Sequence, residues 1–181
     1  SPIYPEADKL HRIAVFFPAY KEDKVIIDSV RSFLEQDYPK EMYDVYVISD
    51  HMQDSTNEAL RQLPIRLLTA TYEDSSKAKA LLLAIRAIQE DGKASGLSDY
   101  RLAYMYDIAV VMDADNVTVP GFLSEVNRAY SAGVKSMQAH RTGKNLNTDI
   151  ALLDGGADIV GQMEVFLSHG AVARRGQQGH H

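Results

Sequence analysis

Two hydrophobic patterns alternate along most of the chain. Short, largely apolar runs predict strands over residues 13–17, 45–48, 65–68 and 106–112, and a fifth strand is expected over residues 134–140. Runs without polar interruption, such as residues 108–112, are typical of strands buried on both faces. The chain is therefore expected to form a sheet in which most strands are parallel and helices cover both faces.

Between these strands, apolar residues recur at helical spacing. The pattern predicts helices over residues 23–36, from about 55 to 63, over 76–89 and over 121–132. Asp23 is a candidate cap for the first helix, and Ser75 and Ser76 are candidates for the third. Residues 92–98 are expected to form a flexible link, and residues 150–166 a less regular helix.

Strands that alternate with helices predict an α/β fold with a Rossmann-like, three-layer arrangement. In such sheets, ligands bind beyond the carboxyl ends of the strands. Polar loops follow strands at residues 18–23, 49–54 and 113–116, so these loops are expected to share one rim. The candidate side chains there are those of Tyr20, Glu22, Asp50, Lys77, Asp113 and Asp115.

The carboxylates of Asp113 and Asp115 follow a predicted strand and stand two residues apart. If the strand geometry persists, both side chains leave the same face and can reach one ion. Mg²⁺ and Mn²⁺ prefer oxygen ligands and keep open positions for phosphate oxygens. The alternative is that one acid caps a turn or helix and the other is solvated.

Each of the other polar rim residues also has two interpretations. Asp50 could accept a hydrogen bond from the ring N–H of a nucleobase such as uracil, or cap the next helix. Tyr20 could stack on a base or pack over the end of the sheet. Lys77 could bind an anion at a helix N-terminus, where its charge opposes the helix dipole, or it could be solvated.

Composition narrows the class of protein. With 181 residues, 45% of them hydrophobic, the chain is long enough for one domain with a core. A net charge of −6 argues against nucleic acid as the main partner, and the absence of cysteine excludes disulfides and thiolate metal sites. Neither a dinucleotide-binding glycine motif nor a P-loop is present. No apolar run could span a membrane, so we expect a cytoplasmic location, with membrane association only through segments outside this chain.

With these residues in view, the chain resembles the family 2 glycosyltransferases. Residues 13–22, Ile-Ala-Val-Phe-Phe-Pro-Ala-Tyr-Lys-Glu, are similar to the first strand and Pro-Ala-Tyr-Asn-Glu loop of that family. Residues 45–56 resemble its Val-Asp-Asp-Gly-Ser-Thr-Asp-Gly-Thr segment, with His51 and Met52 in place of Gly-Ser. Residues 76–82 resemble Gly-Lys-Ala-x-Ala-Leu-Asn, and residues 113–115 match the metal-binding Asp-x-Asp.

The resemblance implies the GT-A fold and transfer of a sugar, with inversion, from a nucleotide-diphospho-sugar, UDP-sugar above all. It implies Mn²⁺ or Mg²⁺ on Asp113 and Asp115. It also implies that the donor is bound by these positions of the chain: Pro18, Ala19, Tyr20, Glu22, Asp50, Lys77, Asp113, Ala114 and Asp115. Asp54 takes the place of the later acid of the second segment.

The resemblance covers residues 12–140, the expected donor- and metal-binding core, and extends more loosely to about residue 175. We therefore expect residues 1–181 to be a partial glycosyltransferase domain, with residues 174–181 a frayed or artificially added end. The catalytic base is expected beyond the chain, and the acceptor, a carbohydrate or a lipid-linked molecule, is not identified. The alternatives are a non-catalytic nucleotide-binding module and a sugar nucleotidyltransferase, although the glycine-rich first loop of the latter is missing.

Overall fold

The computed structural model describes residues 4–98, 101–102, 105–133, 136–141 and 146–152. These residues form an α/β fold around a six-stranded sheet with strand order β3-β2-β1-β4-β6-β5. The parallel strands are β1 (Ile13–Tyr20), β2 (Tyr43–Asp50), β3 (Arg66–Ala70) and β4 (Ile108–Val111). The predicted α/β fold is confirmed.

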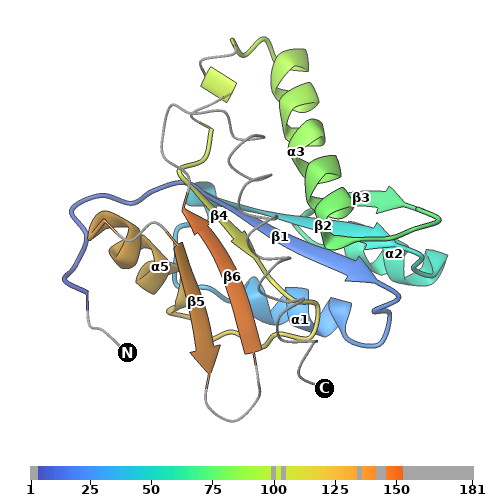
Figure 1. The fold of residues 1–181 in the computed structure, drawn as a ribbon, viewed down its shortest axis with the longest axis horizontal. Coiled ribbons are helices and arrows are strands. Elements are labelled where there is room, and N and C mark those ends of the chain that lie inside the picture. The colour runs from blue at the N-terminus through green and yellow to red at the C-terminus, as the bar shows by residue number, and fades with distance from the viewer. Residues whose placement is uncertain (1–3, 99–100, 103–104, 134–135, 142–145, 153–181) are drawn as a thin grey trace.

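Helices cover both faces of the sheet (Figure 1). On one face, α1 (Ile26–Phe33), α2 (Asp54–Arg61) and α5 (Phe122–Ser131) pack on alternate residues of β1, including Ile13, Val15 and Phe17. On the other face, α3 (Lys77–Ala94) packs on Ala14 and Phe16 of the same strand. Because successive strand residues point to opposite faces, a wholly apolar strand is required at the centre of these three layers.

Strand β1 continues through Pro18 to Tyr20, although the proline was expected to end it. The carbonyl oxygen of Phe16 accepts from the backbone N–H of Met112, so Phe16 directs its backbone polar groups toward β4. Pro18 directs its backbone toward the same side, but β4 ends opposite Phe16. The missing N–H of the proline therefore costs no hydrogen bond in the sheet.

An antiparallel pair extends the sheet beyond β4. Strand β6 (Leu146–Leu152) pairs antiparallel with β4, and β5 (Ser136–Arg141) pairs antiparallel with β6. The expected helix over residues 150–166 is therefore wrong at its start, because residues 150–152 pair with β4. Its remainder lies outside the described residues, as do residues 174–181.

Two predicted helix ends also differ. Helix α3 continues to Ala94, past the expected start of a flexible link, and contains Gly92. A side chain at Gly92 would overlap Leu102, so glycine is required there by a close approach. Asp23 does not cap α1, whose N-cap residue is Val25; it accepts hydrogen bonds at the start of α2 instead.

Within the part of the chain that the structure describes, no helix has both the length and the apolar character needed to cross a membrane.

Candidate functional site

A cleft of about 390 Å³ lies at the carboxyl ends of β1, β2 and β4. The chain runs from β1 to β2 and β3 on one side and then places β4 on the other side of β1. Such a change of direction leaves a crevice beyond the strand ends, where the loops part. The cleft contains all nine positions predicted as ligand-binding: Pro18, Ala19, Tyr20, Glu22, Asp50, Lys77, Asp113, Ala114 and Asp115.

Four further residues of the cleft were not predicted. Ile48 and Ala80 supply an apolar wall, and Ser75 and Ser76 precede α3. The sequence predicts both serines as helix-cap candidates, and Ser76 does cap α3 by accepting from the backbone N–H of Lys79 at 3.1 Å. The spacing of apolar residues could not reveal Ile48 and Ala80, because it cannot separate a residue of the core from one at the edge of a cleft.

Asp113 and Asp115 lie in a turn and not in a strand. Strand β4 ends at Val111, and the backbone N–H of Asn116 donates to the carbonyl oxygen of Asp113 at 3.1 Å. The sequence prediction assumed that strand geometry would place the two acids on one side. They lie in a turn, so strand geometry does not determine their positions. Both nevertheless line the cleft, with Ala114 buried between them.

Lys77 is not simply solvated. Its ammonium group lies 3.0 Å from the Oδ1 atom of Asp113, and only 26% of its side chain is exposed. This ion pair joins the first residue of α3 to the loop after β4. The N-terminal end of α3, with its partial positive charge, and the ammonium group thus face the same cleft.

Asp50 is the last residue of β2 and is buried, with 5% of its surface exposed. Burial by itself would raise its pKa, but hydrogen bonds from Ser75, His51 and the backbone N–H of Tyr72 lower the pKa below its ordinary value. Asp50 is therefore a carboxylate at neutral pH. The alternative that it caps the next helix is wrong, because the N-cap residue of α2 is Gln53.

Tyr20 is half exposed at the mouth of the cleft. Its ring meets the ring of His51 edge-on, with centroids 5.5 Å apart and an interplanar angle of 77°. The ammonium group of Lys21 lies over the same ring, 5.2 Å from its centroid. Tyr20 thus packs on its neighbours and still offers exposed ring surface to a ligand.

The cleft is acidic, because Glu22, Asp50, Asp113 and Asp115 oppose the one lysine among its lining residues. Such a site repels an anion unless a cation binds with it. No group of three or more histidine, cysteine or acidic side chains that could hold a metal occurs among the described residues. Two carboxylates, those of Asp113 and Asp115, line the same cleft, and carboxylate oxygens are ligands that Mg²⁺ and Mn²⁺ prefer.

Comparison with solved structures supports the fold. A mannosyltransferase from Pyrobaculum calidifontis, in complex with GDP-Man and Mn²⁺, has 24% identity and a TM-score of 0.57; the match covers 77% of this chain and 38% of that one. S. aureus TarS 1-349 in complex with UDP-GlcNAc has 18% identity and a TM-score of 0.51, covering 74% and 36%. The chain thus spans less than two fifths of either structure.

Comparison of sequences gives the family. No curated protein sequence matches the chain significantly. The family model described as glycosyltransferase-like family 2, in contrast, matches residues 11–171, which include every described strand and helix. The chain therefore belongs to the glycosyltransferase-like family 2 and has the GT-A fold.

Proposed function

We propose that this chain binds the donor in a glycosyltransferase that transfers a sugar from a nucleotide-diphospho-sugar, with UDP-sugar as the donor. The observation that carries the proposal is the convergence of the nine predicted positions on one cleft. They come from the carboxyl ends of β1 and β2, from the loops after β1 and β4, and from the start of α3, so the fold brings together segments that are far apart in the sequence. The structurally similar proteins whose complexes contain GDP-Man or UDP-GlcNAc agree with a nucleotide-sugar ligand.

In this proposal, Asp113 and Asp115 would hold Mg²⁺ or Mn²⁺ in the cleft where the diphosphate binds. A divalent ion bound there supplies positive charge to the leaving diphosphate and acts as a Lewis acid. Lys77 and the N-terminus of α3 offer further positive charge on the same side of the cleft. The residues of the chain thereby make an acidic cleft suitable for a metal-bound diphosphate.

The nucleoside is proposed to lie between Tyr20 and Asp50. An ionised carboxylate has about four acceptor positions. The hydrogen bond from His51 occupies one of these positions, which leaves acceptor positions for a ring N–H. Uracil, thymine and guanine carry such an N–H on their pairing edge, and adenine does not.

Transfer with inversion requires an acceptor hydroxyl that attacks the anomeric carbon from the face opposite the nucleotide. A carboxylate that takes the hydroxyl proton would act as the base. Four acids line the cleft. Asp113 and Asp115 are proposed to hold the metal and Asp50 the nucleoside, and the resemblance places Glu22 at the nucleoside as well. We therefore propose that the base comes from outside the described residues.

Calorimetric titration of UDP tests the metal proposal. We expect binding with Mn²⁺ and a sharp loss in EDTA, and a loss of tenfold or more, on the order of 1.4 kcal/mol, in Asp115→Asn. Asp91→Asn is the matched control, because Asp91 pairs with Arg66 at the other end of α3. Equal affinity with and without EDTA would contradict the proposed metal site.

Comparison of UDP with ADP tests the nucleoside proposal. UDP should bind the wild-type protein more tightly, and Asp50→Ala should reduce the difference by roughly 1–3 kcal/mol, because the acceptor that discriminates is gone. If ADP binds the wild-type protein as well as UDP does, the assignment of Asp50 is wrong.

A further inference from the structure

His51, which follows Asp50, has a backbone conformation that ordinarily favours glycine. Its φ angle is +56°, in the left-handed region. In the family 2 segment that this part of the chain resembles, glycine occupies this position. A histidine is held there at a conformational cost.

The side chain of His51 contacts two residues of the proposed nucleoside site. Its Nδ1 atom lies 2.5 Å from the Oδ1 atom of Asp50. Because the carboxylate of Asp50 is ionised and only accepts, Nδ1 must carry a hydrogen and donate it. The imidazole ring also meets the ring of Tyr20, which belongs to the end of a different strand.

We propose that His51 is a positioning residue that sets the nucleobase preference of the cleft. Its ring N–H holds one oxygen of Asp50, which limits how the carboxylate can turn toward a base. Its edge contact holds the ring of Tyr20, on which the base would stack. His51 does not line the cleft and acts through these two residues. The inference rests on the proposed function, since it assumes that a base binds between them.

The variant His51→Gly is the main test, with UDP and ADP in the presence of Mn²⁺ as probes. Glycine suits a φ of +56°, so thermal unfolding should stay close to that of the wild-type protein. The affinity for UDP should fall about three- to tenfold, with little change for ADP, because one hydrogen bond to the discriminating carboxylate is lost. The ratio of the two affinities is the readout, since a loss of structure alone would lower both.

His51→Asn separates the two contacts. Asparagine tolerates the left-handed region and has an amide N–H that can donate to a carboxylate, but it has no ring to place against Tyr20. We expect a preference for UDP between those of the wild type and His51→Gly. Glu58→Ala is the control, because Glu58 forms its ion pair with Arg61 of the same helix and does not line the cleft. Its preference for UDP should equal that of the wild type.

Two results would overturn the inference. The first is a preference for UDP that is unchanged in both His51→Gly and His51→Asn, and the second is an equal loss of UDP and ADP binding. If the wild-type protein itself shows no preference for UDP, the proposed function of Asp50 fails first, and the inference fails with it. Wild-type selectivity thus distinguishes the two failures.

Discussion

At the scale of single residues, Asp23 connects the loop after β1 to the start of α2. Its Oδ1 atom accepts from the backbone N–H of Gln53 at 2.9 Å and from the hydroxyl of Thr56 at 2.6 Å. The bond from Thr56, followed by that from Gln53, lowers the pKa of Asp23 below its ordinary value of 3.8. Asp23, which is not among the residues that line the cleft, thus holds two rim loops together.

The variant Asp23→Ala should destabilise the protein by about 1 kcal/mol at pH 7, the usual cost of losing a capping side chain. Because the pKa is lowered in the folded state, this stabilisation is complete above 3.8 and is lost as the pH falls through the lower, folded-state pKa. Urea unfolding of both proteins at several pH values measures the difference. Asp28→Ala, in the first turn of α1, is the control. A difference that persists undiminished in acid would contradict the role of the carboxylate.

At the scale of elements, the ion pair of Lys77 and Asp113 couples α3 to the loop after β4. The pair occupies one carboxylate oxygen of a proposed metal ligand. A metal ion that approaches Asp113 must therefore compete with the ammonium group, unless the diphosphate attracts the lysine. Metal and nucleotide should then bind cooperatively, each raising the affinity of the other by the same factor.

Lys77→Met should bind Mn²⁺ without nucleotide about two- to tenfold more tightly than the wild type, since the competing cation is absent. The enhancement of Mn²⁺ binding by UDP should decrease in the same variant. Titration followed by electron paramagnetic resonance of free Mn²⁺ measures both quantities. Lys79→Met, which removes a charge from the same helical turn without touching Asp113, should behave like the wild type. Weaker Mn²⁺ binding in Lys77→Met would show that the pair does not compete with the metal.

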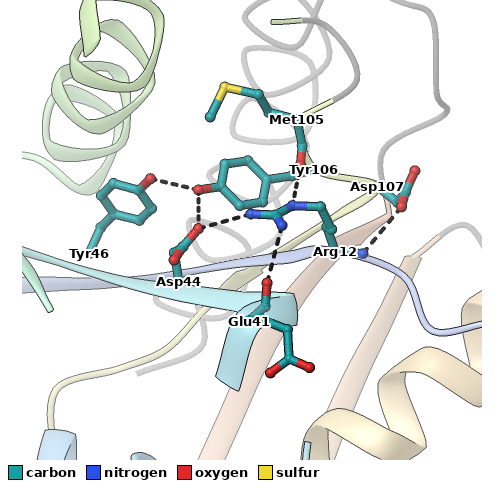
Figure 2. Close-up of polar contacts among 7 residues, drawn as sticks. All are labelled: Arg12, Glu41, Asp44, Tyr46, Met105, Tyr106 and Asp107. Carbon is teal, nitrogen blue, oxygen red and sulfur yellow. Dashed lines mark hydrogen bonds and ion pairs between the residues drawn. The ribbon is translucent and has the colours of Figure 1, made fainter. Parts of the chain in front are cut away.

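A second coupling of elements lies at the opposite, amino ends of the strands (Figure 2). The hydroxyl of Tyr106 donates to Asp44 at 2.6 Å, so the hydroxyl of Tyr46 must donate to Tyr106, at 2.7 Å. Arg12 reaches the same carboxylate at 3.4 Å and also donates to backbone carbonyl oxygens of Met105 and Glu41. Burial above all raises the pKa of Tyr106, which therefore stays a hydrogen-bond donor.

Tyr106→Phe should destabilise the protein by about 1–3 kcal/mol, because it leaves the buried hydroxyl of Tyr46 without this acceptor. Thermal or urea unfolding measures the loss. The affinity for UDP should not change, since Tyr106 lies at the amino ends of the strands and the cleft lies at their carboxyl ends. Asp115→Asn should show the reverse, weaker UDP binding at unchanged stability. If Tyr106→Phe weakens UDP binding in the folded protein, the network at the amino ends of the strands and the cleft at their carboxyl ends are not independent.

At the scale of the whole molecule, the candidate site and the network around Arg12 and Tyr106 lie at opposite ends of the parallel strands. The antiparallel pair β5 and β6 extends the sheet beside β4. In this extension, the backbone of Asp149 pairs with Val111, two residues before Asp113.

We expect this chain to bind UDP-sugar with Mn²⁺ but to transfer sugar barely or not at all. The carboxylates that line the described cleft are proposed to hold the metal and the nucleoside, and catalysis without a base is slower by roughly 10²- to 10⁴-fold. UDP release from a panel of UDP-sugars and acceptors measures transfer. Robust transfer by the 181-residue chain would refute the expectation and direct attention to Asp149, Asp154, Asp158 and Glu164.

The candidate site could be predicted from the sequence to a large extent, because its residues follow buried strands directly. Parallel strands bring their carboxyl ends to one edge, so Tyr20, Asp50 and Asp113 were expected together, and all three line the cleft. Their roles toward a nucleotide-sugar stay predictions. The contact of His51 with Asp50 was missed, although its position after a strand and in place of a glycine was a usable signal.

The sequence by itself determined the α/β class, the alternation of the parallel strands with helices along the chain, and the rim that carries the polar residues. These features depend on local periodicity and on chain direction, both of which can be read along a single segment. Tertiary structure alone decided the rest. Pro18 stays in β1 because β4 ends before reaching it, Asp23 serves α2 because that helix starts beside it, and residues 150–152 form a strand because β4 offers them an edge. Such outcomes depend on neighbours distant in the sequence, which no local pattern specifies.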